Sequence, residues 1–174
     1  MPGMSIKEMK SFLRGAHIAK LATAKRDGWP YVVPVWYEWD GKYCYVVGRK
    51  KSDWIGHIKN DPRVTILIDE PEPPYHKVIM EGIAKVVGVK LSDWVEIGKK
   101  MVKRYYGPAA GISYLQGSLD QPRVTIRITP RRISTWVNPT DKEMKRKPRL
   151  AWHPRYYAAG TRWHKEYRSE RRKR

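Results

Sequence analysis

Apolar and polar residues alternate along three short stretches near the start of the chain, Ile18–Ala24, Tyr31–Trp39 and Lys42–Gly48. Alternation with a period of two is typical of β-strands that are buried on one face. The dipeptides Asp27-Gly28 and Asp40-Gly41 separate the three stretches. Because Asp-Gly readily adopts the positive φ angles of tight hairpins, the pattern predicts an antiparallel three-stranded meander.

Three further stretches have strand patterns, Arg63–Glu70, Lys77–Gly88 and Arg123–Trp136. Gly82 lies within the second of these and predicts a bulge or bend, while Pro130 predicts an interruption of the third. With the first three stretches this makes six predicted strands. Six antiparallel strands with helices between them indicate a small, mainly β barrel.

Serines precede three segments whose apolar residues have helical spacing. Ser5 with Glu8 forms a capping-box sequence, and Ser52 and Ser92 are predicted N-caps. The expected ends of the three helices are Gly15, Asn60–Pro62 and Gly107-Pro108.

Positive charge dominates the composition, with 36 Lys+Arg against 17 Asp+Glu and a formal net charge of +19. Residues 139–174 differ in character from residues 1–138, because cations there alternate with large aromatic residues, namely Trp152, Tyr156, Tyr157, Trp163 and Tyr167. We therefore expect one domain over residues 1–138 and a basic, aromatic-rich C-terminal arm over 139–174. The arm either packs on the barrel or a partner subunit, or binds nucleic acid by stacking and charge.

The lone cysteine, Cys44, lies in a strand pattern and is expected to be an unreactive, partly buried thiol. The N-terminus lacks the apolar core of a signal peptide, and no apolar run reaches membrane-spanning length, so we expect a cytoplasmic protein without a membrane partner. The five histidines show no metal-ligand spacing, so no metal site is predicted.

Three consecutive cations, Arg49–Lys51, stand between a strand end and the predicted helix start at Ser52. Such cations are often merely solvated, but a helix start also favours an anion. Trp36 and Trp54 flank this region and are suited to cover a flat aromatic ligand. Pro34 removes one backbone donor from its strand, which predicts interrupted pairing and free backbone groups there.

The order of these segments from Ile18 to Val87 resembles the pyridoxamine 5'-phosphate oxidase-like FMN-binding split-barrel family. The stretches that carry the resemblance are "IAKLATAKRDGWPYVVPVWYEWDGKYCYVVGRKKSDWIGHIKNDPRVTILID" and "VIMEGIAKV", with "ITPRRISTW" as a weaker match. The resemblance implies a six-stranded antiparallel Greek-key split β-barrel. It also implies a homodimer that holds two FMN molecules at its interface.

Carried over to this sequence, the resemblance implies a set of cofactor-binding residues. The backbone from Val33 through Pro34 and Val35 to Trp36 would contact the flavin ring, and the strand end with the following turn would hold the phosphate. The remaining expected site residues are Val47, Gly48, Arg49, Lys50, Lys51, Ser52, Trp54 and Lys77. One departure is that many relatives carry a lysine where this chain has Trp54.

The resulting functional hypothesis is an FMN-dependent oxidoreductase that acts on a small organic substrate. Catalytic residues are not assigned, because the cofactor carries the chemistry in such enzymes. A deazaflavin-dependent reductase and a haem-binding split-barrel protein are the alternatives within the family. A nucleic-acid-binding protein that acts through the C-terminal arm is the alternative of another class.

Overall fold

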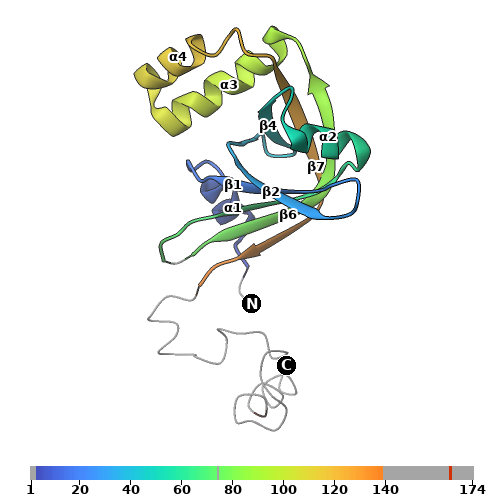
Figure 1. Ribbon diagram of the computed structural model, residues 1–174. Coiled ribbons are helices and arrows are strands. Elements are labelled where there is room, and N and C mark those ends of the chain that lie inside the picture. The colour runs from blue at the N-terminus through green and yellow to red at the C-terminus, as the bar shows by residue number, and fades with distance from the viewer. Residues whose placement is uncertain (1–2, 74, 139–164, 166–174) are drawn as a thin grey trace.

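The computed structural model describes residues 3–73, 75–138 and 165. Within this part of the chain, an antiparallel sheet curls into a split barrel, and two helices form a layer at one end (Figure 1). The strands are β1 (Ala19–Ala24), β2 (Pro30–Val35), β3 (Glu38–Trp39), β4 (Cys44–Arg49), β5 (Arg63–Asp69), β6 (Lys77–Gly88) and β7 (Arg123–Trp136). The helices are α1 (Ile6–Phe12), α2 (Asp53–Asn60), α3 (Leu91–Tyr106) and α4 (Pro108–Gln116).

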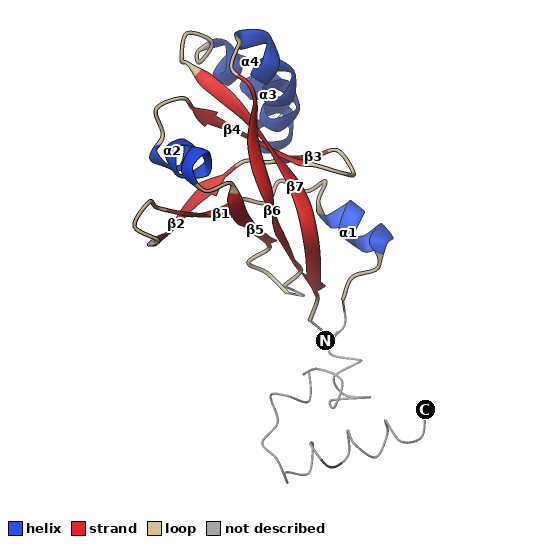
Figure 2. Cartoon of the chain, turned by 90° about the vertical axis from the view of Figure 1, so that its right-hand side faces the viewer, coloured by secondary structure: helices blue, strands red, loops and turns tan. Residues whose placement is uncertain are grey.

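The seven strands follow the order β2-β1-β5-β6-β7-β4-β3. The long strands β6 and β7 pair along most of their length, from Lys77 opposite Trp136 to Gly88 opposite Thr125, and form the spine of the sheet. Figure 2 shows α3 and α4 together at the end of the sheet that is remote from α1. The predicted mainly β split-barrel fold is confirmed, with seven strands in place of six.

The stretch Tyr31–Trp39, predicted as one strand, is two strands at opposite edges of the sheet. The chain leaves the ladder at Trp36 and Tyr37, because the Tyr37 side chain enters the barrel interior and its hydroxyl donates to the Leu13 carbonyl at 3.0 Å. The predicted meander is therefore wrong. The β1–β2 and β3–β4 hairpins both form, but β4 pairs with β7 and not with β2.

The predicted Asp-Gly turns are confirmed by positive φ angles at Gly28 (85°) and Gly41 (101°). The bulge at Gly82 is confirmed as well, because the β6–β7 register shifts between Glu81 and Gly82. The predicted interruption at Pro130 is wrong. β7 runs through Pro130, since the register shift at this point accommodates the missing N–H without ending the strand.

The capping box of Ser5 and Glu8 is present at the start of α1. In α3, however, the N-cap is Lys90 and not Ser92. The Asp93 carboxylate accepts hydrogen bonds from the backbone N–H groups of Lys90 (2.9 Å) and Val89 (3.0 Å), and these bonds lower the pKa of Asp93. A carboxylate at the third helical position thus sets the helix start two residues earlier than the serine would.

The barrel interior is filled by the inward-facing residues that alternate along each strand, and of these Leu21, Ile66, Met80 and Ile126 are completely buried. Cys44 is also fully buried, and burial raises the pKa of its thiol, which agrees with the expected unreactive cysteine. Within the described residues, no helix is long and apolar enough to cross a membrane. The predicted arm, residues 139–174, lies outside the described residues apart from Lys165.

Candidate functional site

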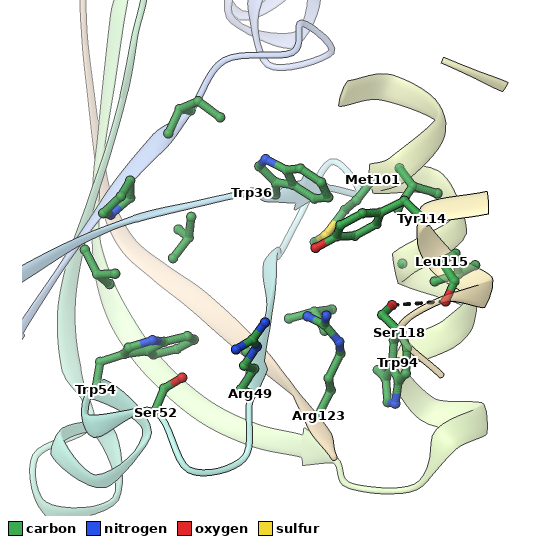
Figure 3. Close-up of a pocket in the computed structure, with 18 residues that line it drawn as sticks. Trp36, Arg49, Ser52, Trp54, Trp94, Met101, Tyr114, Leu115, Ser118 and Arg123 are labelled. Atoms are coloured by element: carbon green, nitrogen blue, oxygen red, sulfur yellow. Dashed lines mark hydrogen bonds between the residues drawn. The ribbon is translucent and has the colours of Figure 1, made fainter. Parts of the chain in front are cut away.

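A cleft of about 420 Å³ lies between the open edge of the barrel and the α3–α4 hairpin (Figure 3). The barrel lines one side with Ile18, Val33, Pro34, Val35, Trp36, Val47, Gly48, Arg49, Ser52, Trp54 and Arg123. The hairpin lines the other side with Trp94, Gly98, Met101, Val102, Tyr114, Leu115 and Ser118. Most of these side chains are apolar or aromatic, which is typical of sites for small molecules and cofactors.

Strand β2 forms the edge of the sheet beside the cleft. Its pairing with β1 continues through Pro34, which lies opposite Lys20, so the predicted interruption is wrong. Free backbone groups arise for a different reason. Because an edge strand is paired on one side only, the alternate N–H and C=O groups of β2 lie outside the ladder, except at Pro34, which has no N–H.

Two arginines lie at one end of the cleft. Arg49 ends β4 and Arg123 begins β7, and the two residues are paired across these strands. Figure 3 shows both side chains directed into the cleft. The Arg123 guanidinium lies 5.4 Å from the centroid of the Trp94 ring, and its Nε is buried without a hydrogen-bond partner in the described residues.

Lys50 and Lys51 belong to the same basic triplet but are exposed and do not line the cleft. The turn is fixed by two backbone hydrogen bonds, from the Lys50 N–H to the Pro122 carbonyl and from the Ser52 N–H to the Arg49 carbonyl, both 2.9 Å. Ser52 does line the cleft. It occupies the N-cap position of α2 as predicted, but its side chain accepts no capping hydrogen bond.

Trp54 forms part of the cleft wall and is 6% exposed. Its indole lies directly against Gly48, where an added Cβ would come within 2.4 Å of the ring. A side chain at position 48 would therefore displace the indole. Gly48 and Trp54 are both predicted site residues, and the structure brings them together at the end of β4.

At the other end of the cleft, Trp36 stacks on Tyr105 of α3, with ring centroids 4.9 Å apart and an interplanar angle of 6°. Tyr114 of α4 lies 5.6 Å from Trp36. The Tyr105 hydroxyl donates to the His17 carbonyl at 2.7 Å and accepts the Tyr37 N–H at 3.4 Å. Burial raises the pKa of Tyr105 to about 12, so the hydroxyl stays protonated at neutral pH.

Polar contacts also join α3 to the barrel. Arg104 forms an ion pair with Glu38 and donates to the Tyr37 carbonyl at 3.2 Å. The Thr125 hydroxyl donates to the Asp93 carbonyl at 3.2 Å. These contacts hold α3 beside the cleft.

Helix α4 was not expected from the sequence, although Pro108 at its first turn is a recognised helix-start signal. It packs closely on α3, because Gly111 has no side chain: a Cβ there would lie 2.6 Å from the Val102 carbonyl oxygen. As a result α4 brings Tyr114, Leu115 and Ser118 to the cleft.

Lys77 is a predicted site residue that the structure places outside the cleft lining. It begins β6, pairs with Asp69 and Trp136, and its Nζ lies 4.3 Å from the centroid of the Trp136 ring. It does not line the cleft, and neither do Lys50 and Lys51. The other predicted site residues all do, while Arg123 and the hairpin residues were missed.

The described residues contain no cluster of three His, Cys, Asp or Glu side chains suited to a metal ion. The cleft instead combines an open strand edge, aromatic walls and two arginines that form no ion pair within the part of the chain that the structure describes. These features match the requirements of a planar ligand that carries an anionic group.

The chain is similar to several known proteins. The family profile of pyridoxamine 5'-phosphate oxidase matches residues 5–137. An uncharacterised protein of Rhizobium meliloti is 33% identical over 69 residues, which are 38% of this chain and 43% of that protein. The chain thus covers less than half the length of this curated relative.

Among solved structures, a conserved hypothetical protein of Mycobacterium tuberculosis is 27% identical with a TM-score of 0.67, over 77% of this chain and 85% of that one. An F420 reductase is 26% identical with a TM-score of 0.56, over 72% and 94%. The haem storage protein of Vibrio cholerae is 19% identical with a TM-score of 0.60, over 77% and 95%, and shows the fold alone. Since the profile match spans most of the chain and the split-barrel fold agrees, the chain belongs to the pyridoxamine 5'-phosphate oxidase family.

Proposed function

We propose that the cleft binds a phosphorylated flavin, with FMN as the first candidate, and that the protein is an oxidoreductase for a small organic substrate. The observation that carries the proposal is the convergence of three features in one cleft. These are the open edge of β2, the aromatic side chains Trp36, Trp54 and Trp94, and the arginines Arg49 and Arg123. A flavin phosphate has a matching polar ring edge, planar ring and anionic end.

The size of the cleft fits this class of ligand. Its volume of about 420 Å³ falls within the range of roughly 300–1,000 Å³ that is common for small-molecule sites. Micromolar affinity requires about 8 kcal/mol, whereas a charge-assisted hydrogen bond contributes only about 1.5–3 kcal/mol. Phosphate contacts alone are therefore insufficient, and burial of the ring between the barrel and the hairpin must supply the rest.

A bound flavin would supply the hydride or electron transfer, and the chain's own residues bind and orient it. The backbone of β2 offers donors and acceptors to the ring edge. The side chains of Trp36 and Trp54 exclude water from the ring faces. In this proposal Arg49 and Arg123, at one end of the cleft, hold the phosphate and thereby fix the direction in which the ring points.

A deazaflavin cofactor is the second candidate, and the 26% identity to an F420 reductase favours it. Like FMN, this cofactor has a phosphate on its ribityl chain, so the arginines suit both. The haem storage protein has the same fold at 19% identity, which gives haem no comparable support.

An absorption spectrum of the purified protein, with mass spectrometry of any ligand released by heat or acid, tests the proposal. We expect the purified protein to show a flavin or deazaflavin spectrum. If it is isolated without a cofactor, we expect the spectrum of bound flavin to appear after incubation with FMN. A protein that is colourless and also binds neither cofactor would contradict it.

The predicted homodimer stays a prediction, which light scattering on the purified protein tests. The nucleic-acid alternative rests on residues 141–174. Deleting them should release bound RNA or DNA while the cofactor is retained if the arm binds nucleic acid, and such binding should weaken steeply with salt. Loss of the dimer on the same deletion would instead indicate that the arm packs.

A further inference from the structure

Only one cation of the basic triplet faces the cleft. The resemblance expects a lysine in the first turn of α2, but this chain has the buried Trp54 there. The neighbouring Lys50 and Lys51 do not replace it, because both are exposed and neither lines the cleft. Arg49 alone would bind a phosphate group only weakly.

Arg123 provides a second cation from a strand remote in sequence. It lies directly across from Arg49 in the β4–β7 pair, and both side chains enter the same end of the cleft (Figure 3). No carboxylate of the described residues forms an ion pair with either arginine. Two adjacent guanidinium groups repel one another unless an anion lies between them.

The Arg123 side chain also has an unused hydrogen-bond donor. Its Nε is buried and has no partner in the described residues. A buried donor without a partner costs free energy, and a bound anion would remove that cost. The Trp94 ring, 5.4 Å from the guanidinium, limits where this side chain can lie.

Ser52 adds a third polar group at this end of the cleft. It stands at the N-cap of α2, where a serine side chain normally accepts a backbone N–H. Here that capping bond is not made, and Ser52 lines the cleft instead. Its hydroxyl is therefore available to donate to an anion.

We infer that Arg123, Arg49 and Ser52 together form the phosphate-binding site of this cleft, with Arg123 in place of the lysine that the family pattern leads one to expect. The inference rests on the proposed function, since it assumes a ribityl phosphate in the cleft. Two guanidinium groups suit the doubly charged monoester of FMN in particular, because each can donate two parallel hydrogen bonds to phosphate oxygens.

The test compares FMN with riboflavin, which has the same ring but no phosphate. Both are titrated by flavin fluorescence into the full chain after removal of any bound cofactor. The variants are Arg123→Ala, Arg49→Ala and, as a matched control on the same strand, Arg132→Ala, which removes the same charge from an exposed position outside the cleft.

We expect Arg123→Ala to weaken the binding of FMN roughly 10- to 150-fold, which is the equivalent of one charge-assisted contact. The same variant should leave the affinity for riboflavin unchanged. Arg49→Ala should have the same effect as Arg123→Ala. Arg132→Ala should change the dissociation constant of neither ligand by more than about twofold, because it alters only the overall electrostatic field of the protein. In the unaltered protein, added inorganic phosphate should weaken the binding of FMN but not that of riboflavin, when sodium chloride keeps the ionic strength constant.

An equal loss of affinity for FMN and for riboflavin in Arg123→Ala would overturn the inference, because Arg123 would then only stabilise the wall of the cleft. Unchanged binding of both FMN and the deazaflavin in that variant would also overturn it while leaving the proposed function intact. If Arg123→Ala does not fold, Arg123→Gln and the phosphate competition provide the same comparison. Failure of the unaltered protein to bind FMN, riboflavin and deazaflavin would overturn both proposals together.

The same variants are titrated with a deazaflavin cofactor to identify the source of the phosphate. A loss that is specific to FMN supports the site and a monoester ligand. A loss that is specific to the deazaflavin supports the site and a diester ligand. No loss with either cofactor contradicts the assignment of Arg123.

Discussion

The barrel interior and the α3–α4 hairpin are stabilised in different ways. Among the described residues, the barrel cluster contains 18 buried residues, whereas the cluster at the hairpin contains three, Trp94, Val102 and Leu115. The hairpin depends more on individual polar contacts with the barrel, such as the Arg104–Glu38 ion pair and the Tyr105–His17 hydrogen bond. The cleft thus has one wall that is fixed by extensive packing and one that is fixed by a few contacts.

The largest effect should come from truncating the barrel core. Ile126 is completely buried, so Ile126→Ala should lower the free energy of unfolding by about 3–5 kcal/mol, through lost burial and the cavity left behind. Leu115→Ala is the matched hairpin variant. Leu115 already borders the cleft and an apolar groove on the outer side of α3 and α4, so its cost should be about 2 kcal/mol or less.

Urea denaturation of the two variants measures this difference. Equal losses in the free energy of unfolding would show that the hairpin is packed as firmly as the barrel, and would contradict the proposed difference between the two regions.

A smaller effect is expected where the ion pair joins the two regions. Arg104→Met should destabilise the fold by about 3 kcal/mol, because it leaves the partly buried Glu38 carboxylate without its cation. The double variant Arg104→Met, Glu38→Gln should recover much of this loss, since no uncompensated charge remains. If the double variant is as unstable as the single one, packing of the Arg104 stem and not the ion pair joins the regions.

The smallest effect should come from the hydroxyl of Tyr105. Tyr105→Phe removes the hydrogen bond to the His17 carbonyl and should cost about 1 kcal/mol at neutral pH. Because the folded state raises the pKa of Tyr105 to about 12, against about 10 in an unfolded chain, its contribution is complete below about pH 10. It is lost as the pH rises from there toward the folded value.

Thermal unfolding from pH 8 to 12 checks this dependence. The unaltered protein should lose stability more steeply above pH 10 than Tyr105→Phe does. Parallel curves would mean that Tyr105 does not link its titration to folding.

The sequence predicts the barrel better than the hairpin. Strand alternation and the Asp-Gly turns locate β1, β4, β5 and β6 closely, because each strand has one face in a continuous core. The separation of β2 from β3 is not visible in the pattern. It depends on the Tyr37 side chain entering the barrel and bonding to Leu13, a tertiary contact between residues 24 positions apart.

The candidate site was predicted in part for the same reason. Residues that lie close in sequence, from Val47 to Trp54, form a recognisable strand–turn–helix motif, although Lys50 and Lys51 within it are exposed and do not line the cleft. Arg123 was missed, because its position beside Arg49 follows from the β4–β7 pairing, which joins residues 74 positions apart and is not readable from local patterns. Leu115 and Ser118 follow only from the packing of α4 on α3.

A crystal structure of the protein grown with FMN is the most direct test of the central claim, that the cleft between barrel and hairpin holds a phosphorylated flavin. We predict electron density for the ring against the β2 edge and for the phosphate within hydrogen-bonding distance of Arg49 and Arg123. Flavin bound elsewhere, for example in the groove on the outer side of α3 and α4, would contradict the account, as would a phosphate remote from both arginines.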